Sequence, residues 1–356
     1  MKKLYAFILA GVSLAAVAQQ GAPASPYYNG FNWTLTGTQL RNALATLTQN
    51  KHTNNLTYSQ VWDALQQTDQ DPSNSNNVLL IYGWENGSDS NVTNDRSRGK
   101  FNNGGSNGEW NREHTFPQGL GNPELGQSGP GADAHHLRAC DVQRNNSRGN
   151  LKFTDGSGIA SGATNGGWYP GEEWKGDVAR MVMYMYLRYG NQCLPTLVGL
   201  GPTAATDSNL PQIFLQWNAE DPVSQYEDNR NTYLGTTANP YGQGNRNPFI
   251  DNPYLATMIW GGPAAQNRWP TLDAQDFQWT MSVSVWPNPS QGNVNISSEV
   301  EIDRIEVISV NGQVIHRIEQ PVFQANQYRV DGLPSGFYLI RLDAAGSSTV
   351  KKVIVN

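Results

Sequence analysis

Charged residues are scarce in this chain of 356 residues: they make up 15% of it, and the net charge is −6. Proteins that bind nucleic acid normally carry a surplus of Lys and Arg, so this charge argues weakly against such a partner. The stretch from Arg96 to Arg188 differs, because it holds 11 Lys and Arg against 9 Asp and Glu, a balance of +2. The acidic surplus therefore lies outside this stretch, and charge alone does not decide the partner.

Long apolar runs are absent after the first residues of the chain. Residues 1–18 are typical of a signal peptide, with Lys2 and Lys3 before an apolar run and Ala16-Val17-Ala18 as the cleavage site. The run is shorter than the roughly 20 residues that a membrane-spanning helix needs. We therefore expect an exported protein, secreted or held at the cell surface, without stable insertion in a membrane.

Cysteine is also rare, since the chain has only Cys140 and Cys193. Neither belongs to a C-x-x-C pair of the kind that holds structural zinc. In an oxidising compartment the two could form one disulfide, and the sequence leaves open whether they do.

Glycine, proline and aromatic residues are abundant by contrast. The chain has 36 Gly and 20 Pro, which favour turns and loops over long helices, and its 11 Trp, 15 Tyr and 10 Phe suffice for a sizeable core. Apolar spacing predicts helices at 40–47, 58–65 and 176–189, a buried strand at 78–82 and a long exposed loop at 86–107. The fold class that we expect is a loop-rich α+β fold.

The composition changes after residue 270. From residue 282 onward, apolar and polar residues alternate in short runs such as 305–310, 337–342 and 349–355, each bounded by turn-forming residues. This pattern predicts a small antiparallel β-sandwich. The segment has no His-rich, Cys-rich or paired acidic cluster, so we expect it to serve attachment or export.

The first block that suggests chemistry is Asn111-Arg112-Glu113-His114, followed shortly by Pro117. An acidic metal ligand beside a histidine supplies two groups that metal-assisted hydrolysis needs. Neighbouring side chains on a flat strand point to opposite faces, so both reach one phosphate only where the strand ends or bends, and Pro117 is placed to end it. Taken alone, the pair is as consistent with structural roles as with catalysis: Glu113 could be a solvated surface acid and His114 a hydrogen-bonded structural residue.

Two further polar blocks follow along the chain. Asp133-Ala134-His135-His136-Leu137-Arg138 leads to Asn145-Asn146-Ser147-Arg148-Gly149-Asn150, which together supply arginines for a phosphate and an amide oxygen for a hard cation. The third block is Gln243-Gly244-Asn245-Arg246-Asn247-Pro248-Phe249-Ile250-Asp251. Taken alone, a polar run such as the second block is usually a loop, and the third block is also typical of a turn fixed by Gly and Pro.

Together the three blocks resemble the endonuclease I family of secreted bacterial nucleases, whose members carry N-R-E-H, then D-x-H-N-L-R-P leading to N-x-x-R-G-N, then Q-G-N-R-N-P-F-I-D. The resemblance covers residues 40–260, and we assign residues 19–270 to the catalytic domain. It implies a ββα-metal core, also called a His-Me finger, in which a β-hairpin supplies the histidine and the following helix supplies a ligand.

The resemblance also implies roles for single residues. Glu113 and Asn145 match the metal ligands, and His114 matches the general base that takes a proton from the attacking water. The cofactor would be one Mg²⁺, with Mn²⁺ or Ca²⁺ as substitutes, and cleavage of DNA and RNA without sequence choice would leave 5′-phosphates. Since a histidine acts as a base only when it is neutral, activity should fall in acid.

The chain departs from the family pattern at two points. His136 and Ala139 stand where the pattern has Asn and Pro, and residues 115–137 contain no Lys or Arg, although some members place a phosphate-binding arginine there. The remaining candidates for that role are Arg138, Arg148, Arg180 and Arg246. We favour Arg148, since it lies one helical turn from Asn145 and can share its face, and we keep Arg138 beside it as a catalytic candidate.

The C-terminal segment has a resemblance of its own. Val285-Trp286-Pro287-Asn288-Pro289, then Leu333-Pro334-Ser335-Gly336-Phe337-Tyr338 and a final Lys351-Lys352-Val353-Ile354-Val355 resemble the sorting domain of the type IX secretion system. We assign it residues 282–356 and expect the type IX machinery as a partner. Such domains are usually removed during export, so the working enzyme would end between Gly262 and Ser284. A permanent surface-binding module is the alternative.

Two other functions fit parts of the sequence. A zinc-dependent hydrolase could use His135, His136, Cys140 and Cys193, although adjacent histidines on a strand point apart. A non-enzymatic surface-binding protein could use the many aromatic residues as a sugar platform, although most of them should be core. The sequence does not indicate an oligomeric state.

Overall fold

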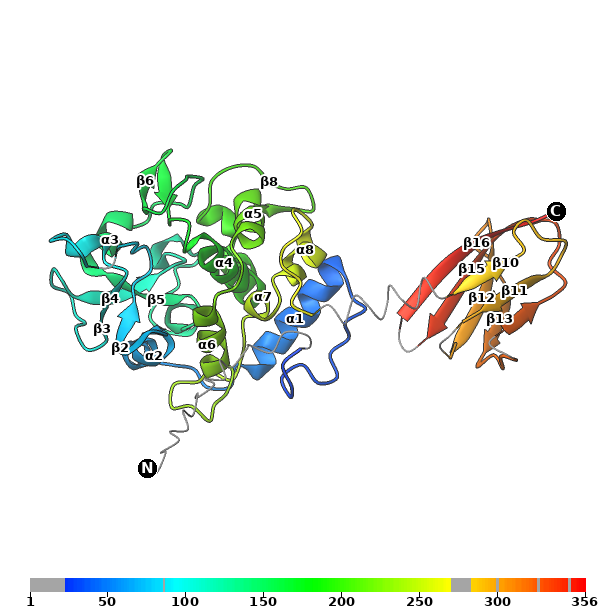
Figure 1. Ribbon diagram of the computed structural model, residues 1–356, viewed down its shortest axis with the longest axis horizontal. Helices are drawn as coiled ribbons and strands as arrows, with labels where there is room; N and C mark the ends of the chain where they lie inside the picture. Colours follow the sequence, from blue (N-terminus) through cyan, green and yellow to red (C-terminus); the bar gives the residue numbers. More distant parts are fainter. Residues whose placement is uncertain (1–22, 86, 270–282, 299–300, 325–326, 345–346) are drawn as a thin grey trace, which may run out of the picture. The chain divides into compact units, whose positions relative to one another are not determined.

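The structure is a computed structural model that describes residues 23–85, 87–269, 283–298, 301–324, 327–344 and 347–356. The predicted signal peptide at 1–18 lies outside these residues. The chain divides into two compact units: unit 1 contains Arg41–Arg268, and unit 2 contains Gly21–Leu40 and Trp269–Asn356. Figure 1 shows the mixed helices and strands of unit 1 and the strands of unit 2.

Helices lie in the first three quarters of the chain. In order, they are α1 Gly37–Lys51, α2 Gln60–Thr68, α3 Val142–Arg148, α4 Lys175–Tyr189, α5 Gln212–Glu220, α6 Gln225–Leu234, α7 Pro248–Asp251 and α8 Tyr254–Trp260. The predicted helices correspond to α1, α2 and α4, which confirms all three. In α2, Val61, Ala64, Leu65 and Thr68 are buried, the spacing of one helix face.

Unit 1 also contains short strands. They are β1 Gln70–Asp71, β2 Asn74–Leu79, β3 Ser97–Gly99, β4 Trp110–His114, β5 Leu137–Asp141, β6 Gly162–Thr164, β7 Gly167–Tyr169, β8 Thr203–Ala204 and β9 Asp207–Pro211. The first three form one antiparallel sheet, and β4 with β5, β6 with β7 and β8 with β9 form two-stranded ladders. Unit 1 is thus an α+β structure with small sheets.

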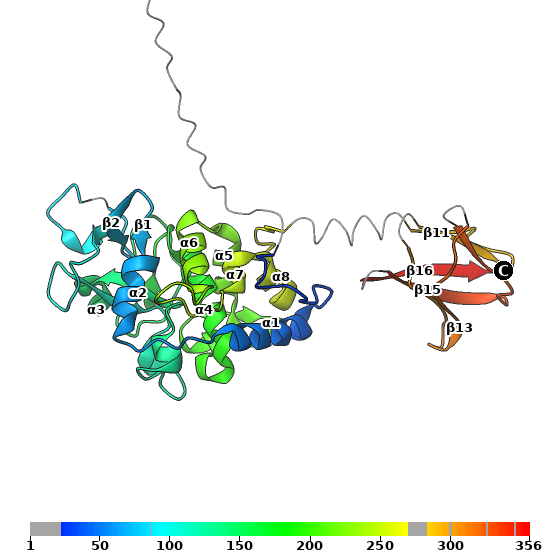
Figure 2. The same ribbon diagram turned by 90° about the horizontal axis from the view of Figure 1, so that it is seen from below.

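Helix α4 runs through the centre of unit 1. Every residue from Lys175 to Leu187 is buried, including Asp177 and Arg180. A helix buried on all sides has other elements around it, and both ribbon views place α4 among its neighbours (Figures 1 and 2). It lies against β5, where Nη1 of Arg138 approaches Asp177 of α4 at 2.9 Å.

The loop predicted at 86–107 is only partly a loop. It contains a 3₁₀ turn at Val92–Asn94 and strand β3, which pairs with β2. The reason is a buried ion pair: Arg98 on β3 lies 2.7 Å from Asp141 and also donates to the carbonyl of Glu109. The prediction of an exposed loop was therefore wrong at β3.

Unit 2 contains an antiparallel β-sandwich, as predicted. Its strands are β10 Ser284–Trp286, β11 Val294–Ser297, β12 Arg304–Ser309, β13 Val314–Glu319, β14 Gln327–Val330, β15 Gly336–Ala344 and β16 Ser347–Val355. One sheet has the order β10-β11-β14 and the other β13-β12-β15-β16. Alternate residues such as Ile305, Val307, Ile340 and Leu342 form the core between them.

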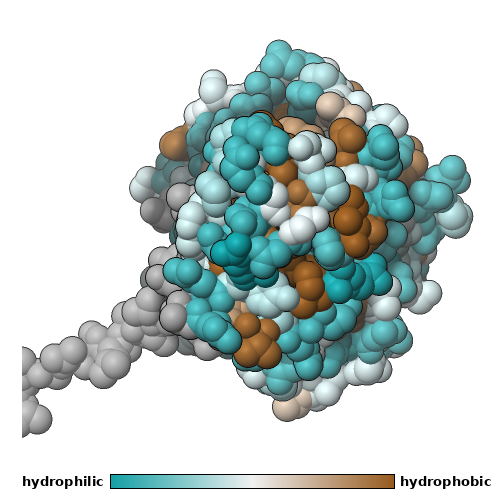
Figure 3. Space-filling model, turned by 90° about the vertical axis from the view of Figure 1, so that its right-hand side faces the viewer, coloured by the Kyte–Doolittle hydropathy of each residue, from teal (hydrophilic) through white to brown (hydrophobic). Residues whose placement is uncertain are grey.

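The surface of the chain is mainly hydrophilic on the face drawn in Figure 3, where apolar residues form separate patches. Within the residues described, no helix has the length and apolar character needed to cross a membrane.

Candidate active site

Strands β4 and β5 and helix α3 form a continuous ββα unit. The strands pair antiparallel, with Glu113 opposite Arg138. Helix α3 begins directly after β5, where the side chain of Asp141 accepts a hydrogen bond of 2.9 Å from the backbone N–H of Arg144 and caps the helix. It ends at Gly149, whose φ of 50° is a backbone conformation that favours glycine. Residues 115–136 connect the two strands.

Helix α3 packs on one face of β4. Asn111 and Glu113 are two residues apart on the strand and therefore share a face. Asn145 donates from Nδ2 to Oδ1 of Asn111 at 2.7 Å, and Nη1 of Arg148 lies 3.1 Å from Oε1 of Glu113. Since both contacts come from one face of α3, Asn145 and Glu113 lie on the same side of the strand.

Glu113 is a buried carboxylate whose closest contacts with the described residues are at Oε1. Its Oε1 accepts a hydrogen bond of 3.0 Å from the hydroxyl of Tyr82 and faces Arg148. Burial raises the pKa of Glu113 to about 7, and the opposing effects of Arg148 and Tyr82 do not offset it. Both contacts involve Oε1, which leaves Oε2 available to a cation.

His114 is the last residue of β4 and lies on the opposite face. Its Nε2 lies 2.9 Å from the carbonyl oxygen of Gly131, so this nitrogen carries the proton and donates. The unprotonated nitrogen of the neutral ring is then Nδ1. Burial, together with His136, lowers the pKa of His114 to about 3, so the ring stays neutral in mild acid. Protonation of His114 therefore does not explain the fall of activity in acid that the sequence analysis expects.

The backbone beyond His114 is fixed by Arg148. Its Nη1 donates to the carbonyl of His114 at 3.0 Å, and its Nη2 donates to the carbonyl of Thr115 at 2.9 Å. The side chain is 1% exposed and lies over the ring of Phe153. This burial does not fit the expected contact of Arg148 with phosphate, and the guanidinium instead joins α3 to the end of β4.

The other arginines that the sequence suggested are also engaged with carboxylates. Arg138 is fully buried, with Nη1 2.9 Å from Asp177, and lies over the ring of Tyr226. The remaining two pairs, Arg180 with Glu227 and Arg246 with Asp251, each have a shortest contact of 2.6 Å. These contacts fit structural roles.

Arg112 is not among the arginines that the sequence suggested for a phosphate. It lies on β4, half-buried, with its guanidinium 3.5 Å from the centre of the Tyr58 ring and 4.3 Å from that of Trp62. Its position next to Glu113 in the first block was the available signal.

The zinc alternative finds no support in the geometry. His135 and His136 each use Nε2 on a backbone carbonyl, at 2.9 Å to Asn245 and 2.7 Å to Pro130. Cys140 is buried with Sγ 3.4 Å from the carbonyl of Ile81. Where the chain is described, no three His, Cys, Asp or Glu side chains gather as a metal site. The two cysteines are free, so the possible disulfide is not formed.

The third block holds the segment that precedes β5. Gln243 donates from Nε2 to Oδ1 of Asp133 at 2.9 Å and accepts from the N–H of Ala134 at 2.7 Å. Oδ2 of Asp133 accepts from the hydroxyls of Tyr184 and Tyr189. This buried network fixes the position at which β5 begins, so the contacts of the third block are structural.

Residues 36–254 match the Endonuclease I family, which covers more than half of the chain and includes β4, β5 and α3. The chain belongs to the endonuclease I family. It is 42% identical over 260 residues to an extracellular ribonuclease of Bacillus subtilis (strain 168), covering 70% of this chain and 83% of that protein. An extracellular ribonuclease of Bacillus amyloliquefaciens is 41% identical over 256 residues, covering 69% and 82%.

The protein is therefore a nuclease, and a non-enzymatic surface-binding function is excluded. Residues 284–356 match the secretion system C-terminal sorting domain. With the extracellular relatives of the endonuclease I family, this domain indicates a secreted or cell-surface enzyme. A solved structure of PorZ from Porphyromonas gingivalis is 16% identical over 23% of this chain and 12% of that chain, with a TM-score of 0.20, too low to compare folds.

Proposed function

We propose that the β4–β5–α3 unit is a one-metal, His-Me finger site that hydrolyses phosphodiester bonds of DNA and RNA without sequence choice. The observation that carries this proposal is the arrangement at the end of β4. Glu113 and Asn145 lie on the α3 side of the strand, and His114, the last residue of β4, keeps Nδ1 unprotonated. The extracellular ribonuclease relatives support RNA as one substrate.

The residues at this end of β4 fit a hard divalent cation. Glu113 offers the oxygen Oε2, and the hydrogen bond from Nδ2 of Asn145 to Asn111 leaves the amide oxygen of Asn145 free to bind. One carboxylate and one amide oxygen, completed by water, are the ligands that Mg²⁺ takes, with Mn²⁺ or Ca²⁺ as substitutes. Such an ion, when bound, stabilises negative charge on the phosphate and on the leaving oxygen.

The protein's own groups supply the proton transfer. His114 accepts a proton at Nδ1 from the attacking water, while its Nε2–H continues to donate a hydrogen bond to the carbonyl of Gly131, which keeps the ring oriented. The water oxygen forms a bond to phosphorus as the bond from phosphorus to the 3′ oxygen breaks. The 3′ oxygen takes a proton from solvent, so the products carry a 3′-hydroxyl and a 5′-phosphate. Arg148 acts as a positioning residue, because it holds Glu113 and the backbone carbonyls of His114 and Thr115.

We further propose residues 1–18 as a signal peptide, 19–270 as the mature catalytic domain and 282–356 as a sorting domain recognised by the type IX secretion machinery. The match of residues 284–356 to the sorting domain supports the third of these assignments. Removal of this domain during export would leave an enzyme that ends between Gly262 and Ser284.

The proposed function is tested by incubating the purified protein with plasmid DNA and with RNA, in Mg²⁺, Mn²⁺, Ca²⁺ or EDTA. We expect both substrates to be degraded with at least one of these metals, EDTA to abolish cleavage, and the fragments to accept a 3′-end label without phosphatase treatment. A folded protein that cleaves neither substrate with any of the three metals would overturn the proposal, and 3′-phosphate ends would overturn the mechanism.

A further inference from the structure

Arg112 lies beside the base that the proposed function assigns. Arg112 and His114 are two residues apart on β4 and point to the same face of the strand. Both side chains contact Tyr58: the guanidinium carbon of Arg112 is 3.5 Å from the ring centre, and the ring of His114 stacks on it at 5.4 Å. A fixed positive charge therefore adjoins the histidine.

The aromatic side chains hold this guanidinium in one orientation. It lies over Tyr58 and also over Trp62 on α2, at 4.3 Å. Its Nη1 donates to the backbone carbonyl of Tyr58, whereas its Nε is buried without a hydrogen-bond partner. An oriented guanidinium loses little conformational entropy when it binds two oxygens of one phosphate.

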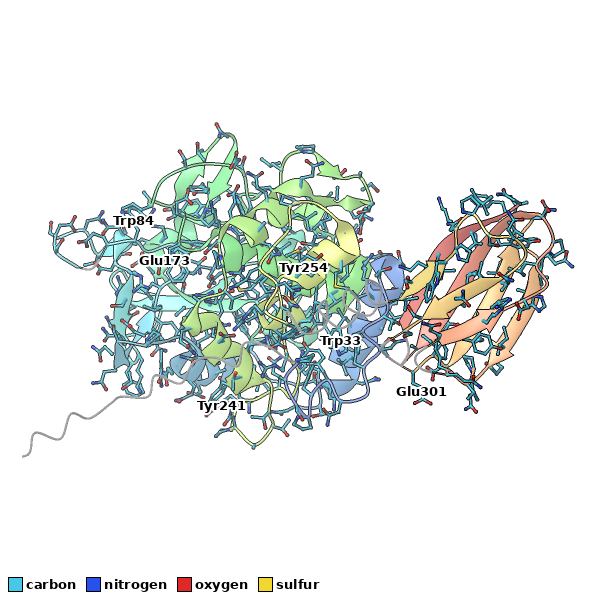
Figure 4. All side chains as sticks on the ribbon, turned by 45° about the vertical axis from the view of Figure 1, so that its right-hand side comes forward. Trp33, Trp84, Glu173, Tyr241, Tyr254 and Glu301 are labelled. Carbon is cyan, nitrogen blue, oxygen red and sulfur yellow. The ribbon has the colours of Figure 1, made fainter. Side chains whose placement is uncertain are left out.

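Arg112 differs from most arginines of unit 1 in having no carboxylate beside it. The arginines that form ion pairs with carboxylates are Arg41, Arg96, Arg98, Arg138, Arg148, Arg180, Arg230, Arg246 and Arg268. Within the residues described, Arg112, Arg144 and Arg188 have no such pair. Arg144 lies over Trp84, which Figure 4 labels, and donates to two backbone carbonyls. Arg188, at the end of α4, lies over Tyr189.

We infer that Arg112 binds the phosphate of the nucleic-acid backbone at the cleavage site and stabilises its charge during hydrolysis. This inference rests on the proposed function, because it takes His114 as the base. It gives the phosphate a partner that residues 115–137 cannot supply, since that segment contains no Lys or Arg. Arg138 and Arg148, which the sequence suggested for this role, are already paired with Asp177 and Glu113.

The test compares Arg112→Gln and Arg112→Lys with the control Arg188→Gln, which removes another arginine that has no carboxylate partner. The first readout is cleavage of plasmid DNA under the metal that supports wild-type activity. The second is binding of a short fluorescein-labelled DNA duplex in EDTA at several salt concentrations, which needs no catalysis. Thermal melting of each variant checks the fold.

We expect Arg112→Gln to lower kcat/KM by roughly 10²- to 10³-fold, as the loss of one group that stabilises transition-state charge does. For the same variant, the slope of the logarithm of the DNA association constant against the logarithm of salt concentration should become shallower by about 0.9, the value for one phosphate contact on duplex DNA. Arg112→Lys should keep the salt slope and regain only part of kcat/KM, because lysine lacks the planar fork. Arg188→Gln should change neither.

An Arg112→Gln protein with wild-type salt slope and wild-type cleavage would overturn the inference. If Arg112→Gln does not fold, a folded Arg112→Lys protein with full kcat/KM would overturn the bidentate contact. Absence of metal-dependent cleavage by the wild type is a different failure: it refutes the proposed function, and the salt slope in EDTA still decides whether Arg112 contacts phosphate.

Discussion

His114→Gln lowers kcat for metal-dependent DNA cleavage by about 10²- to 10⁴-fold, the usual contribution of a general base. Glutamine can still donate a hydrogen bond to the carbonyl of Gly131, which His114 contacts through Nε2 at 2.9 Å. It has no nitrogen that can accept a proton at neutral pH. The substitution therefore separates the base from the structural contact, and DNA affinity in EDTA should stay the same.

The matched control for this substitution is His136→Gln. His136 makes the same kind of contact, from Nε2 to the carbonyl of Pro130 at 2.7 Å, and its ring lies 5.5 Å from that of His114. We expect only a small loss of kcat there, because His136 has no proposed part in proton transfer. If a folded His114→Gln protein keeps full activity, or loses no more activity than a folded His136→Gln protein, His114 is not the base.

Arg148→Met lowers the free energy of unfolding by about 3–5 kcal/mol, the cost of removing one partner of a buried ion pair. The carboxylate of Glu113 would lose the guanidinium that lies 3.1 Å away, and two backbone carbonyls would lose their donors. Urea unfolding at pH 8 measures this loss, because the pKa of Glu113, about 7, leaves the carboxylate of the wild type largely ionised there, and Arg148 is one of the groups that lower this pKa.

The Glu113→Gln/Arg148→Met double variant is the control for stability. It removes both charges, so it should be more stable than Arg148→Met alone although it cannot bind metal through a carboxylate. A loss below about 1 kcal/mol in Arg148→Met, typical of an exposed pair, would show that Arg148 is accessible in solution. Arg148 would then again be a candidate for the phosphate-binding arginine.

The sequence indicated the position of the candidate residues better than their contacts. The spacing from Asn145 to Arg148 predicts a shared helix face, and both residues do face β4. The spacing does not predict which residues that helix face contacts, and in the structure the guanidinium of Arg148 pairs with the buried carboxylate of Glu113. Burial decides such pairings, and it depends on residues far along the chain, such as Phe153 over Arg148.

The same limit applies to the fold. Helix α4 was predictable because Val178, Val182 and Met185 repeat at helical spacing, and the sandwich strands because apolar and polar residues alternate. Strand β3 was not predictable, because the chain around it is polar and its pairing depends on Arg98 meeting Asp141, 43 residues away in sequence. Ion pairs of this kind leave no local pattern.

The most direct test of the metal site is calorimetric titration of Mg²⁺ or Mn²⁺ into the metal-free protein at pH 8 and pH 6. We expect one ion per chain and binding about tenfold weaker at pH 6 than at pH 8, because a proton competes with the metal for Glu113, whose pKa is about 7. His114, with a pKa of about 3, stays neutral at both pH values and does not contribute to this difference. Glu113→Gln and Asn145→Ala should each weaken binding, and Glu113→Gln should remove its pH dependence. Equal binding by the wild type and both variants would contradict the assignment of Glu113 and Asn145 as the metal ligands.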